Sequence, residues 1–108
     1  VRMAMRLDPY SAHGWAHLLG RALMMSGSYA DGAEAYLKST FPRFGYYADA
    51  AGCYAALGRD QDAAAQAARA LEMNSDFTIS GYVEGLAYLN EADRARHRKI
   101  LEAAPLPA

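Results

Sequence analysis

The chain has few of the features that mark secreted, membrane or disulfide-rich proteins. Its 108 residues contain a single cysteine, Cys53, which excludes an internal disulfide and fits a reducing compartment. No uncharged apolar run approaches the roughly 18 residues that a membrane span requires, and no signal peptide is visible. We therefore expect a soluble, cytoplasmic protein without a membrane partner.

A strong charge of either sign is also lacking. The formal net charge is −1, which provides no overall field for nucleic acid or for an anionic membrane. The one basic cluster comprises Arg94, Arg96, His97, Arg98 and Lys99, and no aromatic residues are interleaved with it to stack on bases. We interpret the cluster as the solvated outer face of a helix and expect no nucleic-acid partner.

Residues that would form a metal site or a reactive thiol are missing. His13 and His17 are one helical turn apart, but a zinc site needs three or four ligands, and no third appears at a suitable spacing. Cys53 has no basic residue nearby to lower its pKa, so it is expected to be a small buried side chain. The sequence predicts no metal and no cofactor.

A catalytic constellation is missing as well. The glycines are dispersed rather than gathered in a phosphate-binding loop. The acid pairs Asp60 with Asp62 and Glu91 with Asp93 stand at predicted helix starts, where they complement the helix dipole. Nothing combines a general acid with a nucleophile, so no catalytic residue is predicted and the chain is not expected to be an enzyme.

Alanine and helical periodicity are what the sequence does contain. Alanine is the commonest residue type, and runs of β-branched residues are absent, which favours closely stacked helices over sheets. Short loops between the helical segments predict antiparallel neighbours. From the apolar spacing we predict helices over 12–26, 29–39, 46–57, 60–73, 77–89 and 94–103.

A similar phrase occurs twice, once at Gly27 and again at Gly58. Gly27-Ser28-Tyr29 follows one predicted helix and Gly58-Arg59-Asp60 follows another, and each phrase leads into a segment rich in small residues. A period in the thirties is typical of helical repeat proteins. Gly27 is predicted to end its helix as a left-handed C-cap, and Gly58 is predicted to follow the end of the helix before it.

These residues resemble tetratricopeptide repeats. The pitch of 31 is shorter than the usual value of about 34, Asp60 stands where the first unit has the aromatic Tyr29, and Trp15 sits one position early. The positions that carry the resemblance are Gly20, Gly27, Tyr29, Tyr36, Tyr54, Gly58 and Ala63.

The resemblance implies an all-α fold, namely a right-handed superhelix of antiparallel helix pairs in a single domain. We expect this domain to be a fragment of a longer protein. Its expected parts are the tail of a preceding repeat (1–9), repeat 1 (12–42), repeat 2 (44–75) and a C-terminal capping helix pair (76–104).

A narrower resemblance covers the last third of the chain. Asp76-Phe77, the segment Glu91 to Arg94 and the ending Leu106-Pro107 are similar to the C-terminal tails of certain bacterial proteins. Those proteins carry a class III adenylate or guanylate cyclase domain, or a DNA-binding regulatory domain, ahead of a tetratricopeptide region. The resemblance implies a regulatory or dimerisation module at the C-terminus of such a protein.

The repeat resemblance implies that the first helix of each unit lines a concave groove. The main expectation is therefore a non-catalytic scaffold that binds a peptide or a partner helix there. Self-association through the groove is an alternative. In the second unit small residues such as Ala48 and Gly52 could admit an apolar partner helix, or could be covered by the chain's own last helix. The predicted partner-binding residues are His17, Arg21, Met24, Met25, Tyr82 and Leu86.

Overall fold

Every regular element in the described part of the chain is an α-helix. The computed structural model describes residues 12–39, 42–86, 88 and 90–108, so the expected repeat tail at 1–9 lies outside it. The helices are α2 (Ala12–Met25), α3 (Tyr29–Leu37), α4 (Phe44–Ala56), α5 (Asp60–Met73), α6 (Ile79–Glu84) and α7 (Glu91–Glu102). The predicted all-α class is confirmed. Within these residues no helix has the length and apolarity to cross a membrane.

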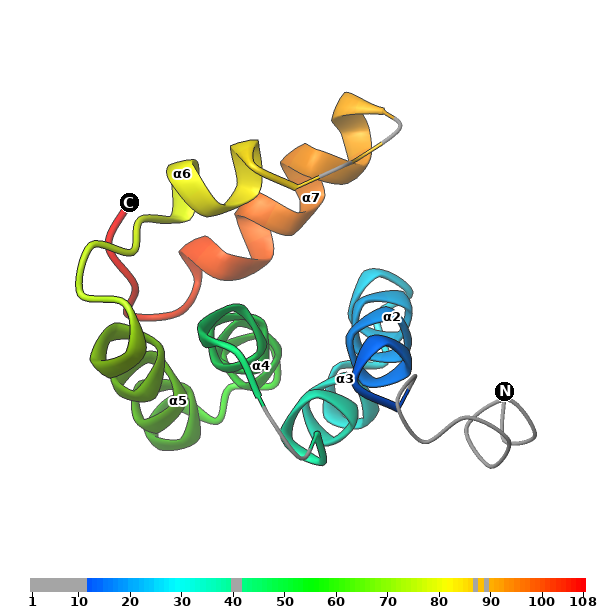
Figure 1. Cartoon of the computed structure of the whole chain (residues 1–108), viewed down its shortest axis with the longest axis horizontal. Helices are drawn as coiled ribbons and strands as arrows, with labels where there is room; N and C mark the ends of the chain where they lie inside the picture. The colour runs from blue at the N-terminus through cyan, green and yellow to red at the C-terminus, as the bar shows by residue number, and fades with distance from the viewer. Residues whose placement is uncertain (1–11, 40–41, 87, 89) are drawn as a thin grey trace.

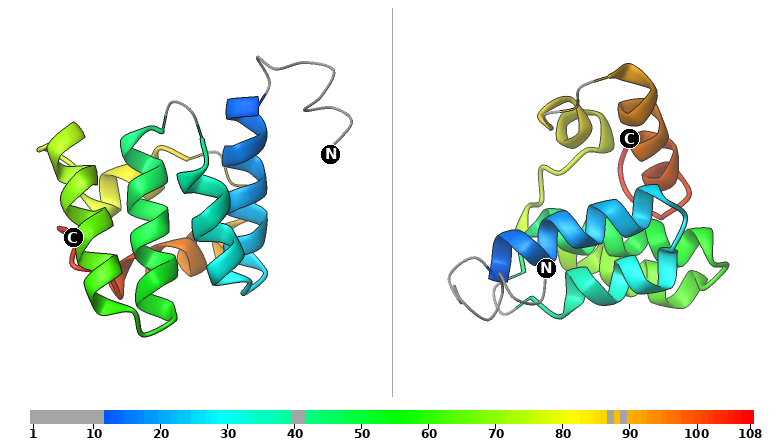
Figure 2. Two further views of the ribbon diagram at one scale, coloured as in Figure 1. Left: turned by 90° about the horizontal axis from the view of Figure 1, so that it is seen from below. Right: turned by 90° about the vertical axis from the view of Figure 1, so that its right-hand side faces the viewer.

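The helices form a row with a second layer across it. Helices α2, α3, α4 and α5 lie side by side and antiparallel, while α6 and α7 cover one side of that row (Figures 1 and 2). Helix α7 packs against α4, α6 and α2. The last two helices thus lie across the row, whereas the sequence suggests a pair that caps its end.

The doubled phrase corresponds to two copies of one backbone turn. Gly27 ends α2 with φ +91°, and Gly58 ends the α4 region with φ +77°. The next amide closes each turn, since Ser28 N–H donates to Leu23 O at 2.8 Å and Arg59 N–H donates to the Tyr54 carbonyl at 2.9 Å. This closure is the Schellman motif, which requires a left-handed residue that glycine adopts without strain.

The first helix pair, α2 and α3, packs large side chains against glycine. A Cβ atom on Gly20 would lie 2.8 Å from Cδ2 of Tyr36, and one on Gly32 would lie 3.1 Å from the Met24 backbone nitrogen. Tyr36 and Met24 are both fully buried. The sequence predicts a groove position for Met24, whereas the structure places its side chain in the core between the helices.

The second pair, α4 and α5, packs almost entirely through small residues. The buried face of α5 consists of Ala63, Ala67 and Ala70. At the repeat pitch Ala63 and Ala67 correspond to Gly32 and Tyr36, so an alanine replaces the ring that fills the first pair. Cys53 is fully buried on α4, as predicted.

The buried face of α7 accounts for how this helix docks. His97, Ile100 and Leu101 share one face at a spacing of three and four residues, and all three are buried. Arg96 and Lys99 lie on the opposite side and are exposed. The predicted solvated face is therefore right for Arg96 and Lys99 and wrong for His97.

Helix α6 is shorter than the sequence suggests, and α7 begins earlier. The prediction of one helix over 77–89 fails because the chain leaves the helix at Gly85. Asn90 then caps α7 ahead of the predicted start at Arg94, with its Oδ1 accepting the Asp93 amide at 2.9 Å. At the other end of α6, Ile79 N–H donates to Pro107 O at 2.8 Å and ties the C-terminal tail to the helix.

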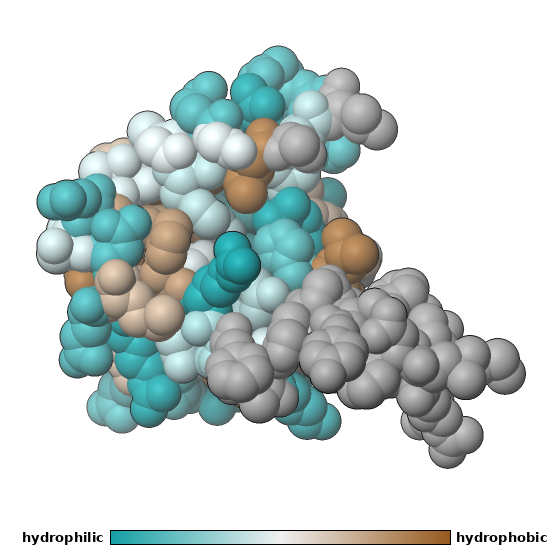
Figure 3. All heavy atoms as spheres, viewed as in Figure 1, coloured by the Kyte–Doolittle hydropathy of each residue, from teal (hydrophilic) through white to brown (hydrophobic). Residues whose placement is uncertain are grey.

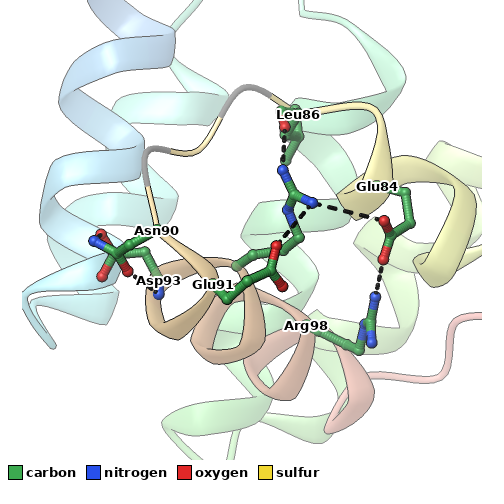
Figure 4. A network of polar contacts seen from close by, with 7 residues as sticks. Glu84, Leu86, Asn90, Glu91, Asp93 and Arg98 are labelled. Atoms are coloured by element: carbon green, nitrogen blue, oxygen red, sulfur yellow. Dashed lines mark hydrogen bonds and ion pairs between the residues drawn. The ribbon is translucent and has the colours of Figure 1, made fainter.

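Surface ion pairs join α6 to α7 (Figure 4). Arg94 Nη1 lies 3.1 Å from Glu91 Oε1 and 3.7 Å from Glu84 Oε2, and Arg94 Nη2 donates to Leu86 O at 3.3 Å. Arg98 also pairs with Glu84. Exposed pairs of this kind are worth at most about 1 kcal/mol each, so they orient the hairpin more than they stabilise it.

Candidate functional site

A cavity of about 430 Å³ lies where α2, the start of α4 and α6 meet. A smaller cavity of about 170 Å³ shares two of its lining residues, Phe44 and Tyr82, so the two cavities are neighbours. We call this pair of cavities the furrow. The larger cavity is lined by His17, Arg43, Phe44, Gly45, Tyr46, Tyr82 and Leu86. The smaller cavity adds Asn74, Asp76, Phe77, Thr78 and Gly81.

Aromatic rings build the walls of the larger cavity. The His17 imidazole stacks on Tyr46 with ring centroids 5.5 Å apart, and Phe44 meets Tyr82 edge to face at 6.0 Å. A Cβ atom at position 45 would lie 2.8 Å from the Tyr82 hydroxyl, so glycine there allows α6 to approach α4. The cavity is thus largely apolar, with a few polar groups at its edges, which is typical of ligand pockets.

A buried polar network lies beside the cavity. Asp49 on α4 and His97 on α7 are both fully buried. His97 Nε2 lies 2.7 Å from Asp49 Oδ1, and the Tyr82 hydroxyl donates to Asp49 Oδ2 at 3.1 Å. His97 Nδ1 lies 2.6 Å from the Tyr88 hydroxyl. A carboxylate can only accept, so His97 Nε2 is the donor in its contact with Asp49, and in the neutral imidazole Nδ1 is then the acceptor toward Tyr88.

This network holds α6 and α7 on α4. The imidazole of His97 and the carboxylate of Asp49 have no exposed surface, so in this structure they do not present an acid or a base to a substrate. Sequence reasoning missed both residues as partners. The available signals were a single acid within the apolar, alanine-rich stretch 44–56 and the spacing of His97 to Ile100.

Arg21 places a positive charge behind the cavity wall. Its Cζ atom lies 5.6 Å from the centre of the Tyr88 ring. Its Nε and Nη2 atoms are buried, and among the described residues they have no hydrogen-bond partner. Burial opposes its charged form, but the neighbouring Tyr36, Asp49 and Tyr88 raise the pKa of Arg21 above its usual value, so the guanidinium stays charged.

The same charge acts on three residues of the cavity wall. Burial and then Arg21 lower the pKa of His17. Burial raises the pKa of Tyr46, and Arg21 acts in the opposite direction. Burial also raises the pKa of Tyr82 well above its usual range; Asp49 adds to that shift and Arg21 opposes it. The positive potential of Arg21 therefore extends into the cavity, although Arg21 does not line it.

The predicted partner-binding residues fall into three groups. His17, Tyr82 and Leu86 line the larger cavity, and Arg21 lies directly behind its wall. Met25 is half-buried against the core cluster that contains the fully buried Met24. The structure brings His17, Tyr82 and Leu86 together at one cavity, leaves Arg21 outside its lining and places the two methionines elsewhere.

In the second pair, α4 is covered at Gly52 by the chain's own last helix. A Cβ atom on Gly52 would lie 3.0 Å from Ile100 Cγ2 and 3.2 Å from Leu101 Cδ2, both on α7. Of the two alternatives that the small residues of α4 left open, the structure shows the second. The furrow is the part of this side that α7 leaves accessible.

The described residues offer no set of side chains suited to a metal ion. In the ranges that the structure covers, no group of three or more His, Cys, Asp or Glu residues comes together. Burial raises the pKa of the Cys53 thiol to about 12, so it stays protonated at neutral pH. Neither feature suggests metal or thiolate chemistry.

Searches with protein-family models and against curated proteins and solved structures found no match to this chain. The class that the fold defines is an all-helical protein with an aromatic furrow on one side of a helical row. What the furrow does is inferred from its geometry.

Proposed function

We propose that the chain is a non-catalytic interaction module of the tetratricopeptide type, and that it binds a short segment of a partner protein in the furrow. The observation that carries this proposal is the aromatic wall built by α2, α4 and α6. Rings at a concave surface bury large apolar area with little loss of side-chain freedom, which is why they act as anchors in interfaces.

Two structural features support the repeat type. Both helix pairs end their first helix with the same left-handed glycine and the same closing hydrogen bond, at Gly27 and at Gly58. In addition, the four helices α2 to α5 lie side by side as antiparallel neighbours (Figure 2). Both features are expected of a stack of helix pairs.

The accessible part of the furrow fits a short extended segment. The two cavities share Phe44 and Tyr82 in their lining, so neighbouring side chains of an extended chain could enter one cavity each. On the face drawn in Figure 3, outside the grey atoms, apolar residues form separate patches and no broad area. The same furrow would serve the alternative, a C-terminal regulatory module of a larger bacterial protein.

Selection of random peptides on the chain tests this proposal. Enriched peptides are synthesised, and their affinity is measured by fluorescence anisotropy for the wild type, for Arg21→Glu and for Arg69→Glu. Arg69 is the matched control because it also lies over a tyrosine ring, with its Cζ 5.7 Å from the centre of the Tyr47 ring. Arg69 belongs to α5, which does not line the larger cavity. We expect roughly tenfold weaker binding to Arg21→Glu, because the field of Arg21 at the cavity is reversed, and unchanged binding to Arg69→Glu.

Three results would count against a binding role for the furrow. They are no enrichment of any peptide, equal losses in the two variants, and no loss in Arg21→Glu. Circular dichroism and melting curves of each variant show whether an affinity change reflects binding or folding.

A further inference from the structure

The larger cavity is electrostatically unbalanced. Two arginines act on it, Arg43 from its rim and Arg21 from behind its wall, and Asp49 is the acid whose charge reaches the same walls. The Asp49 carboxylate already accepts bonds from His97 and Tyr82. Arg21 and Asp49 carry opposite charges that act on each other, so the charge left over is that of Arg43 at the rim, and a positive charge beside a partly desolvated cavity favours an anionic occupant.

Two buried polar groups, one on the cavity wall and one behind it, bear on this argument. Arg21 Nε and Nη2 and His17 Nδ1 are buried, and none of these atoms has a hydrogen-bond partner among the described residues. Leaving a buried polar atom unpaired costs about 1 to 3 kcal/mol. An anion in the cavity would be attracted to the charge of the guanidinium even without direct contact.

The volume and lining of the cavity indicate what the uncharged part of the ligand should be. Its volume of about 430 Å³ lies in the range of small-molecule sites, which starts at about 300 Å³. Phe44, Tyr46 and Tyr82 present ring faces and edges, and aromatic pairs gain about 0.5 to 1.5 kcal/mol beyond the area that they bury. An aromatic ring therefore fits these walls better than an aliphatic one.

We propose that this cavity binds a small aromatic carboxylate, in which a single ring carries an acid group one or two bonds away. The ring lies between Phe44, Tyr46 and Tyr82, and the carboxylate faces Arg43 in the field of Arg21. This site goes beyond the proposed partner-binding role, because a free small acid would occupy the cavity without any partner protein.

Calorimetric titration of the whole chain with phenylacetate tests the site. Phenylacetamide serves as the neutral analogue and cyclohexylacetate as the aliphatic one. We expect phenylacetate to saturate with a Kd below about 1 mM, within reach of a ligand of this size. Binding of the amide should be roughly tenfold weaker, as expected for loss of a charge-assisted contact, and the aliphatic acid should fall in between.

Variants separate the site from the rest of the surface. Arg43→Gln should weaken phenylacetate binding roughly tenfold through the lost contact, and Arg21→Gln should weaken it by a smaller factor through the lost field. Arg69→Gln removes an arginine of α5 that lies over the Tyr47 ring, and this variant should bind as the wild type does. Melting curves of each variant show whether a change in affinity reflects binding or folding, since Arg21 also interacts with Tyr88 and Asp49.

Several outcomes would overturn the inference. They are no saturable binding, equal affinity for acid and amide, or the same affinity in Arg43→Gln and Arg21→Gln as in the wild type. A peptide that ends in phenylalanine and binds roughly tenfold more tightly than phenylacetate would also overturn it, since the occupant would then be a chain end. If selected peptides bind the chain and phenylacetate does not, the small-acid site is wrong and the partner-binding proposal stands. If phenylacetate binds and no peptide is enriched, the partner-binding proposal is wrong and the small-acid site stands.

Discussion

The two helix pairs share a backbone turn but differ in what stands at equivalent positions of their first helices. His17 and Arg21 on α2 correspond, at the repeat pitch, to Ala48 and Gly52 on α4. The small pair on α4 lets α7 lie directly on the helix, and Ile100 covers Gly52. The large, polar pair on α2 fills that space and leaves a cavity beside it. Side-chain size at two positions thus decides which part of the concave side is covered and which stays open.

The same comparison extends to the next position of the two helices. Leu18 on α2 is 58% exposed, while its counterpart Asp49 on α4 is fully buried. Asp49 holds His97 and therefore fastens α7 to the second pair. The first pair is joined to the last helices through the half-buried Arg21 and Tyr88. The second pair therefore anchors the hairpin of α6 and α7, and the first pair contributes His17 to the site.

Removing Asp49, which holds α7 on α4, should have the largest effect on stability. Asp49→Ala leaves the buried His97 imidazole without its acceptor, and we expect a loss of about 3 kcal/mol in the free energy of unfolding, measured by urea denaturation. Asp60→Ala, an exposed acid in the first turn of α5, is the control and should cost less than about 1 kcal/mol. Similar small losses for both would show that the second pair does not depend on the network.

The second-largest loss of stability is expected when Gly52 in the second pair is replaced by arginine, the residue at the equivalent position of the first pair. Gly52→Arg places at this site the residue found at position 21, and the side chain cannot fit beneath Ile100 and Leu101. We expect a loss of roughly 2 to 3 kcal/mol and faster hydrogen exchange in α7. Ala56→Arg, one turn later on the same helix and exposed, should change little. A well-tolerated Gly52→Arg would contradict the covered state of this helix.

The two glycine turns should respond alike. At Gly27 and Gly58 an added Cβ would meet no atom within 4 Å, so alanine there changes only the backbone preference. We expect Gly27→Ala and Gly58→Ala each to cost about 1 to 2 kcal/mol in thermal or urea unfolding, the cost of a left-handed alanine. Gly85→Ala, where φ is −78°, serves as the control and should be neutral or slightly stabilising. Clearly unequal costs at positions 27 and 58 would show that the two turns are not equivalent.

The smallest effect is expected from the pH dependence of the first pair. The pKa of His17 is lowered by burial and by Arg21, so the unfolded chain takes up this proton first as the pH falls. The free energy of unfolding should therefore decrease as the pH drops from about 7.5 through 6.5, and this contribution should level off below the folded-state pKa. His17→Gln should flatten the profile in this window. An unchanged slope in the variant would show that His17 is not in the environment that the structure gives it.

Local signals predicted the local parts of the fold well. The expected helix over 60–73 matches α5, and the glycine ends at positions 27 and 58 are confirmed because a helix stop depends on a few neighbouring residues. The acids placed at helix starts also lie in the first turns of α5 and α7.

Long-range contacts set the limit of such predictions. Asp49 and His97 are 48 residues apart, and neither has a sequence neighbour that reveals its partner. His97 was assigned to the solvent because four basic residues surround it, although its spacing to Ile100 and Leu101 marks a buried face. Three of the six predicted partner-binding residues line the cavity, but Phe44 and Tyr46 were missed because their role depends on where α6 docks.

The shortness of α6 has a consequence for the order in which this molecule opens. A helix of six residues is far below the length that holds together alone in water, so α6 persists only while it is docked. Its Tyr82 forms the wall that both cavities of the furrow share. Release of α7 would therefore dissolve that wall while α2 to α5 stay folded, and the furrow would be lost at a lower free-energy cost than global unfolding.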